Sequence, residues 1–198
     1  RQAGLVEVYP LDFRRFSQDK HRTVDDRPFG GGPGMVLKPE PIFDAVEWVE
    51  STYGPCRRIL LTPDGTPFHQ ADALEFSQEK RLLLLCGRYE GVDQRVLDYY
   101  EFEEVSIGDY VLSGGEPAAM ILADACIRLL DGAVGNDETT TYESHENGLL
   151  EHAHYTRPVQ WTAPDGTVMP VPEVLTSGHH ENIEKWRNED AQKLTLQN

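Results

Sequence analysis

The segment best suited to binding a small molecule is residues 107–116, Ile-Gly-Asp-Tyr-Val-Leu-Ser-Gly-Gly-Glu. It follows a short apolar segment and runs directly into an apolar helix that is expected to begin near Pro117. Gly114 and Gly115 carry no side chain, so the backbone there can turn sharply or lie against a ligand. Pro117 suits the first helical turn, where its missing N–H costs nothing. The pattern predicts a pocket at the end of a strand, with a ligand contacted mainly by main-chain amides and carbonyls.

Two further predicted strands end in turns of the same kind, Leu-Thr-Pro at 61–63 and Cys-Gly-Arg-Tyr-Glu-Gly at 86–91. Ligands of parallel sheets bind at the carboxyl ends of the strands, so the three turns could line one pocket. Each could equally be a tight connection from a strand to a helix. The run Gly-Gly-Gly-Pro-Gly at 30–34 exposes N–H groups that could cradle an anion. It lacks the Gly-Lys-Ser/Thr of a P-loop, and a mobile surface loop explains it equally well.

Histidines near the end of the chain suggest a second chemistry, a zinc site of the kind a metal-dependent hydrolase uses. Neither a His-Glu-x-x-His motif nor a Cys-x-x-Cys pair is present. Exposed histidines in a turn-rich segment are therefore the favoured interpretation, and no metal ligand is predicted. The residues concerned are His152, His154, His179 and His180, with Glu143, His145 and Glu146 nearby.

Cations next to aromatic rings indicate RNA binding, because rings stack on bases while cations meet phosphates. The net charge of −16 argues against a nucleic acid held by bulk electrostatics, but a local basic strip can still bind one. Solvated surface charge would explain any single cluster. Together they make RNA a hypothesis to test, with Arg22, Arg27, Arg157 and Arg187 as the candidate contacts. The clusters are His21-Arg22, Arg27, Arg88-Tyr89, Tyr155-Thr156-Arg157 and Lys185-Trp186-Arg187.

The elements that must position these residues alternate between apolar runs and amphipathic segments, which predicts an α/β fold with a mainly parallel sheet. Composition changes at Gly135, where a polar stretch without apolar periodicity begins. We therefore expect a first domain over 1–134, a flexible linker over 135–148 and a small, mostly helical part over 149–198. Strands are predicted over 5–11, 58–62, 81–86 and 102–107, and helices over 40–50, 69–76, 92–99, 116–130 and 181–192.

The compartment follows from cysteine usage and hydropathy. The three cysteines are far apart, odd in number and set among apolar neighbours, so buried thiols in a reducing cytoplasm are expected. No apolar run approaches the length of a membrane span, and no signal-peptide pattern opens the chain. The chain starts at Arg1 without a methionine, and we expect its true start to lie upstream.

Taken together, these motifs resemble the bacterial tRNA (guanine-N1)-methyltransferases, a family of the SPOUT superfamily. The resemblance rests on long ordered words that cover nearly the whole chain, unlike a lone glycine motif. They lie at 25–35, 86–91, 106–116, 154–158, 171–172 and 175–178.

The resemblance implies a deep trefoil knot in the sheet, S-adenosylmethionine as methyl donor, and a homodimer with each active site built across the interface. The substrate would be the guanosine just 3′ of the tRNA anticodon, methylated on N1. A magnesium requirement and a tRNA-gripping helical domain that continues beyond Asn198 are also implied. The implied donor pocket comprises Leu61, Pro63, Gly87, Tyr89, Glu90, Gly91, Ser106, Ile107, Gly108, Asp109, Tyr110, Val111, Leu112, Gly114 and Gly115.

The same resemblance assigns the catalytic groups. Guanine N1 carries a proton at neutral pH, so a base must remove it, and a cation near O6 would stabilise the developing negative charge. By motif, Arg128 fits the cation. The family's base is an aspartate followed by serine in the linker; ungapped counting puts that position on Glu143, before Ser144, with Asp137 a weaker candidate. The alternative function is a non-catalytic module that binds RNA or S-adenosylmethionine.

Overall fold

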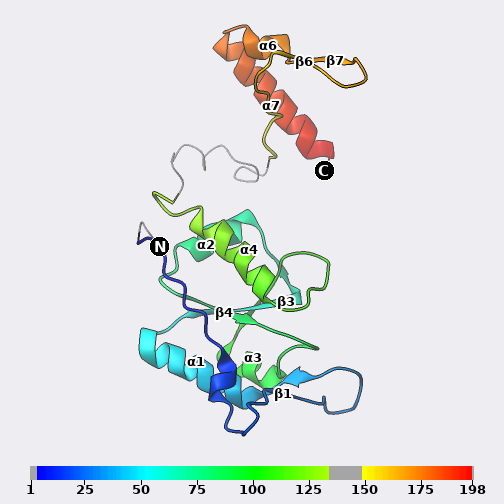
Figure 1. Cartoon of the computed structure of the whole chain (residues 1–198). Helices are drawn as coiled ribbons and strands as arrows, with labels where there is room; N and C mark the ends of the chain where they lie inside the picture. Colours follow the sequence, from blue (N-terminus) through cyan, green and yellow to red (C-terminus); the bar gives the residue numbers. More distant parts are fainter. Residues whose placement is uncertain (1–3, 134–148, 198) are drawn as a thin grey trace. The chain divides into compact units, whose positions relative to one another are not determined.

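The computed structural model describes residues 4–133 and 149–197. The chain divides into two compact units, Arg1–Gly135 and Asn136–Asn198, and each is described by itself (Figure 1).

In its described part, the first unit contains a parallel sheet of β3 (Arg57–Pro67), β4 (Leu82–Cys86) and β5 (Glu103–Ser106), in the order β4-β3-β5. Four α-helices flank the sheet: α1 (Pro39–Tyr53), α2 (Gln70–Ser77), α3 (Gln94–Tyr100) and α4 (Glu116–Ile127). Figure 1 shows α1 and α3 on one face of the sheet and α2 and α4 on the other. The predicted α/β class with a parallel sheet is confirmed.

Alternation along β3 explains the two faces. Ile59 and Leu61 are buried in a core cluster with residues of α2 and α4. Leu60, between them, is buried in a second cluster with residues of α1 and α3. Successive side chains of a strand point to opposite faces, so a run of apolar residues marks a strand that is covered on both sides.

The end of β3 differs from the prediction. The turn signal after Thr62 predicts that the strand stops, but it extends to Pro67. The register shows what happens, because Val105 of β5 pairs with Leu61 and then again with Thr66. The residues between form a bulge that leaves the ladder and returns to it. At Gly65 a Cβ atom would lie 2.5 Å from the Glu104 carbonyl carbon, so the return path admits only glycine.

The start of the described chain was also predicted wrongly. Residues 5–11 do not form a strand, and Leu5, Val8 and Tyr9 are exposed. Alternation alone does not make a strand, because ladder hydrogen bonds require a neighbour. The 3₁₀ helix η1 (Phe13–Phe16) and the short antiparallel pair of β1 (Asp25–Asp26) and β2 (Val36–Leu37) carry no periodicity long enough to predict.

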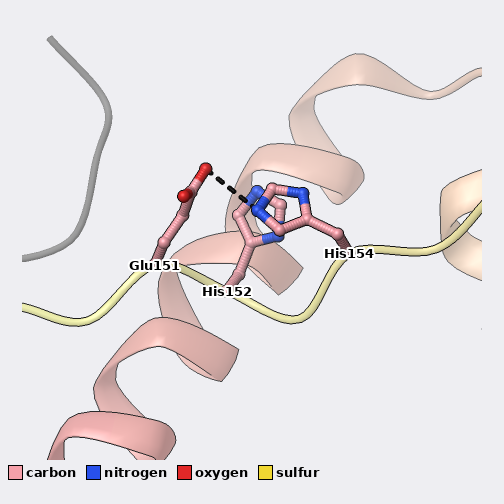
Figure 2. Close-up of side chains that lie close together, drawn as sticks. All are labelled: Glu151, His152 and His154. Atoms are coloured by element: carbon pink, nitrogen blue, oxygen red, sulfur yellow. Dashed lines mark ion pairs between the residues drawn. The ribbon is translucent and has the colours of Figure 1, made fainter. Parts of the chain in front are cut away.

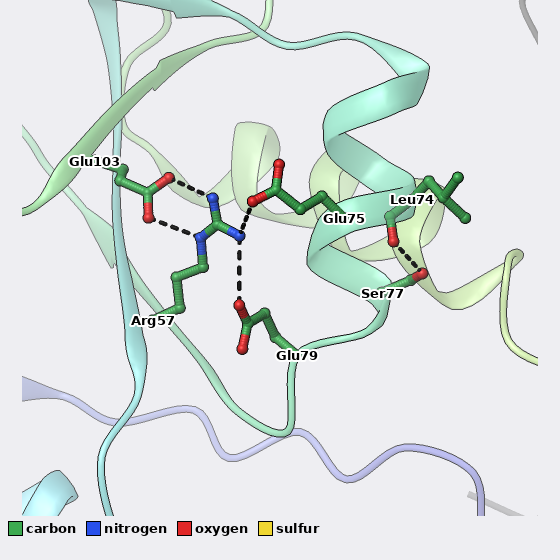
Figure 3. Close-up of polar contacts among 6 residues, drawn as sticks. All are labelled: Arg57, Leu74, Glu75, Ser77, Glu79 and Glu103. Carbon is green, nitrogen blue, oxygen red and sulfur yellow. Dashed lines mark hydrogen bonds and ion pairs between the residues drawn. The ribbon is translucent and has the colours of Figure 1, made fainter.

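Arg57 ties β3 to β5 and α2 (Figure 3). Its Nε and Nη2 donate to both carboxylate oxygens of Glu103 at 2.7 and 2.8 Å, and its Nη1 donates to Glu75 at 2.6 Å and Glu79 at 3.4 Å. Its guanidinium also lies 4.5 Å from the ring centroid of Phe76. The two-pronged pair with Glu103 fixes the geometry of β3 against β5 as well as adding energy, and the bond to Glu75 attaches α2 to the same strand.

The second unit contains an antiparallel pair, β6 (Gln160–Thr162) with β7 (Val168–Pro170), followed by α6 (Glu173–Thr176) and α7 (His180–Gln197). The helix predicted over 181–192 is confirmed but runs longer. The strand pair was not predicted, because three-residue strands are too short to show alternation. None of the described residues of this unit is buried.

The cysteine prediction is correct in part. Cys126 is buried, whereas Cys56 and Cys86 are half-buried. None of the described helices has the length and apolar character that crossing a bilayer requires.

Candidate active site

Three loops meet at one edge of the parallel sheet. Leu61 pairs with Cys86 on one side and Val105 on the other, so the segments that follow these residues leave the sheet side by side. The first segment is the bulge of β3 that contains Pro63 and returns to the ladder at Thr66, and the other two are the loops at 87–91 and 107–115. The structure therefore brings together the three turns that the sequence suggested could line one pocket.

The second and third loops are in direct contact. The backbone N–H of Gly115 donates to the carbonyl of Gly87 at 2.9 Å. A Cβ atom on Gly115 would lie 2.8 Å from Cα of Cys86, so only glycine allows this approach. Across the same contact, Nη2 of Arg88 lies 2.7 Å from Oε1 of Glu116, the first residue of α4. Gly115 therefore closes the loops against each other at the start of α4.

The glycine-rich run at 30–34 leads into this group of loops. Directly after it, the carbonyl of Met35 accepts a hydrogen bond from the N–H of Glu90 at 3.0 Å. The N–H of Leu37 donates to the carbonyl of Gly91 at 2.9 Å, and Leu37 also forms an isolated parallel β-bridge with Val92. The end of the run at Gly34 therefore lies beside the loop at 87–91, which favours a role at this edge over an unrelated surface loop.

Buried Ser106 shapes the third loop. Its Oγ donates to the carbonyl of Gly108 at 3.2 Å and accepts from the Gly108 N–H at 3.3 Å. The Tyr110 hydroxyl donates to the carbonyl of Ile107 at 3.2 Å, and the Tyr110 N–H donates to the Gly108 carbonyl at 2.9 Å. The backbone of this loop is thus held by its own contacts.

Side-chain exposure separates the candidate donor residues into two groups. Leu61 is buried in the core, so its side chain belongs to the fold and only its backbone is available at the edge. Pro63, Glu90 and Asp109 are exposed. Four apolar or aromatic side chains are also exposed at this edge, although such side chains are normally covered. They are Tyr89, Tyr110, Val111 and Leu112.

The electrostatics at this edge favour an ionised carboxylate and a neutral thiol. Desolvation alone would raise the pKa of Glu116, but hydrogen bonds from its own backbone N–H and from Arg88 lower it below its usual value. Burial raises the pKa of the Cys86 thiol to about 11, helped by the charge of Glu116. A raised pKa keeps the thiol protonated and therefore poorly nucleophilic at neutral pH.

Arg128 does not join these loops within one chain. It is the C-cap of α4, whereas Gly115 is the N-cap of the same helix. Twelve helical residues separate the two, which corresponds to about 18 Å. Glu143 and the weaker candidate Asp137 lie outside the described residues. Among the described residues, the predicted cation is therefore not assembled with the donor loops.

Of the predicted RNA contacts, Arg157 and Arg187 both line one hollow of the second unit, with a volume of about 420 Å³. Tyr155 also lines this hollow, and the centroid of its ring lies 6.2 Å from that of the Trp186 ring. Arg22 and Arg27 are exposed on the first unit. The residues of the basic-aromatic strip are thus divided between the two units.

A further group of candidate ligands, Glu151, His152 and His154, lies within the second unit. The sequence pointed to the two histidines but not to Glu151. The spacing Glu-His-x-His, which places three candidate ligands within four residues, was the signal available for it.

Comparison with known proteins identifies relatives. The family model described as tRNA (Guanine-1)-methyltransferase TrmD matches residues 1–198. A tRNA (guanine-N(1)-)-methyltransferase of Dehalococcoides mccartyi is 49% identical over 98% of this chain and 76% of its own length. Proteins of the same name from Agrobacterium fabrum and Anoxybacillus flavithermus are 50% and 47% identical, each over 98% of this chain, and over 81% and 78% of their own lengths.

Proposed function

This chain belongs to the tRNA (guanine-1)-methyltransferase family, and from this premise we propose that it transfers a methyl group from S-adenosylmethionine to N1 of the guanosine 3′-adjacent to the tRNA anticodon. The observation that carries the proposal is the meeting of three loops at one sheet edge, because these loops hold two of the motifs on which the family resemblance rests. Membership of this family makes the chain an enzyme. The alternative function is a module that binds RNA or S-adenosylmethionine without catalysis, and a methyl-transfer assay distinguishes the two.

We assign donor binding to the three loops. The backbone of residues 87–91 and 107–115 would contact the donor, since Gly115 and its bond to Gly87 bring these two main chains together. Tyr89, Tyr110, Val111 and Leu112 would cover its apolar and planar parts, which accounts for their exposure at this edge. When bound, S-adenosylmethionine supplies an electrophilic methyl group.

Removal of the guanine N1 proton and stabilisation of the developing negative charge are assigned to side chains of this chain. Guanine N1 becomes a nucleophile when its proton leaves, and we assign that proton transfer to the Glu143 carboxylate. We assign Arg128 to the neighbourhood of guanine O6, where its charge would stabilise the negative charge that develops as the proton leaves. The loops contribute by holding the reacting atoms in line.

A homodimer with shared sites would reconcile the positions of Arg128 and the donor loops. The two lie at opposite ends of α4 in one chain, so a partner subunit can supply the cation to the other's donor loops. Met120 and Ile121 of α4 are apolar and exposed, as residues of an interface would be in a single chain. We expect a solution mass of twice 22.4 kDa by light scattering and a single-chain mass for Ile121→Glu. A wild-type chain that stays monomeric would contradict the shared site.

The tRNA would be held by both units. Arg157, Arg187 and the neighbouring rings of Tyr155 and Trp186 offer cations and stacking surfaces, and Arg22 and Arg27 add cations on the first unit. We further propose the trefoil knot, a cytoplasmic location, and the division into a donor domain, a linker and a tRNA-binding part. The magnesium requirement stays a prediction, checked by adding EDTA to the methylation assay.

The test is transfer of labelled methyl from S-adenosylmethionine to a full-length tRNA with guanosine after the anticodon. We expect transfer to that tRNA and none when adenosine replaces the guanosine. Donor binding by calorimetry without any transfer would support the non-catalytic alternative. Absence of donor binding would remove the donor-site assignment altogether.

The base is tested separately with Glu143→Gln. This variant should bind tRNA normally and lose transfer by about 10²- to 10⁴-fold, the usual contribution of a general base. Glu146→Gln, in the same segment, is the matched control and should retain transfer. A Glu143→Gln variant that methylates at the normal rate would show that the base is another residue.

A further inference from the structure

Three side chains of the extended segment before Tyr155 converge in the second unit (Figure 2). Glu151, His152 and His154 offer one carboxylate oxygen and two imidazole nitrogens, and these three atoms lie within 4.8 Å of one another. Oε1 of Glu151 is 3.0 Å from Nε2 of His154, and the two histidine rings have centroids 4.7 Å apart. Ligands about 2.0–2.2 Å from a zinc ion are about 3–4 Å apart, so small side-chain rotations would complete a site.

The backbone that carries these ligands is anchored on both sides. The N–H of Leu150 donates to Oγ1 of Thr195 at 2.8 Å, and the N–H of Ala153 donates to Oδ2 of Asp190 at 2.8 Å. Both acceptors belong to α7. The segment is thus attached to a helix immediately before Glu151 and again between the two histidines, which reduces the ordering that metal binding would require.

His152 also has the second contact that metal-binding histidines usually have. Its Nδ1 lies 3.1 Å from the carbonyl oxygen of Ala153. A carbonyl oxygen only accepts, so in the neutral ring Nδ1 carries the proton and Nε2 keeps its lone pair. The side chains of Glu151 and His154 are 34% and 66% exposed, which leaves space for an ion and its remaining water ligands.

We propose that Glu151, His152 and His154 bind one divalent late first-row transition-metal ion, of the Zn²⁺ class, with water completing its coordination. Two imidazoles and a carboxylate suit Zn²⁺, Ni²⁺ or Cu²⁺, whereas Mg²⁺ prefers oxygen ligands alone. This site is therefore separate from the magnesium requirement of the proposed function. The ion would fix the segment that leads directly into Tyr155 and Arg157, so its role is structural.

The experiment is a calorimetric titration of the full chain with Zn²⁺ alone. We expect saturable binding at one site that is weakened at least about tenfold by each of Glu151→Gln, His152→Gln and His154→Gln, because losing a direct ligand costs at least as much as losing an outer contact. The His179→Gln/His180→Gln double variant is the matched control from the same unit and should bind like the unmodified chain. Excess Mg²⁺ should not displace the ion.

A second measurement needs no variant of the ligands. The His152 ring lies 6.1 Å from the ring of Trp186, so Ni²⁺ bound here should quench Trp186 fluorescence. The signal is isolated by comparison with Trp186→Phe. Absence of quenching or of saturable Zn²⁺ binding would overturn the proposal. So would unchanged affinity in His152→Gln and His154→Gln, or loss of binding in the His179/His180 control.

Discussion

Replacing Gly115 with alanine tests the contact that joins the loops of the candidate site. The backbone of Gly115 has φ −77° and ψ −11°, which alanine adopts without strain, so the change acts through the new methyl group alone. That methyl would lie 2.8 Å from Cα of Cys86, whereas ordinary contacts begin near 3.4 Å, so the loops must separate by about 0.6 Å. Cys86 belongs to a strand of the sheet and cannot simply move away.

The expected loss of stability follows from that displacement. Overpacking costs about 1–3 kcal/mol. Alanine also stabilises by restricting the unfolded chain and destabilises as a poorer N-cap than glycine; these two effects on the free energy of unfolding oppose each other, and each is smaller than the overpacking cost. For a chain of this length the midpoint of thermal unfolding should fall by about 2–12 °C. Because the loops also separate, the affinity for S-adenosylmethionine should fall on the order of tenfold.

Gly87→Ala is the matched control, because its methyl would meet only Cγ2 of Val92, at an ordinary 3.8 Å. Its stability should change by no more than about 0.5 kcal/mol. Thermal unfolding and calorimetric titration with the donor measure both quantities for both variants. If Gly115→Ala has the stability and donor affinity of the unmodified chain, or if Gly87→Ala is destabilised equally, the close approach of the loops does not organise this site.

Three further predictions concern stability and reactivity. Arg57→Met removes the bidentate pair with Glu103 and should destabilise the first unit by about 1–2 kcal/mol in urea unfolding. Arg57→Lys keeps the charge without the bidentate geometry and should recover part of that loss. Equal destabilisation by the two substitutions would contradict the bidentate account. The hydrogen bond from Arg58 lowers the pKa of Glu50, so the stability advantage of the unmodified chain over Glu50→Gln should be full above the usual value near 4.5 and shrink as pH falls through the lowered one. A difference that is constant from pH 7 to pH 3 would contradict this. With a pKa of about 11, about one Cys86 thiol in a thousand is ionised at pH 8, so alkylation by iodoacetamide should be slow at pH 8 and accelerate toward pH 11.

The residues of the candidate donor site could be proposed from sequence because glycine and proline turns follow directly from apolar runs. Their environments could not. Leu61 was assigned to the donor pocket, but its side chain lies in the core on one face of β3. The exposure of Tyr110 and Val111 likewise depends on what the rest of the fold covers, and no local pattern reports that.

What the sequence determined by itself was the order of the central strands and helices and the family. Apolar periodicity and turn residues act over a few positions, so the segments that became β3, β4, β5 and α1 to α4 were recognisable where each occurs. The family followed from ordered motifs spread along the chain. The C-terminal end of β3 and the short strands β1, β2, β6 and β7 were not predicted, because each forms only by pairing with another segment.

The tertiary structure alone decided which of these local features meet. Pairing of β3 with both β4 and β5 puts three loops at one edge, and the close approach of Gly115 to Cys86 joins two of them. Such contacts arise from strand pairing and packing between residues far apart in the chain, or from the folded path of the backbone, and neither leaves a periodic trace in the sequence.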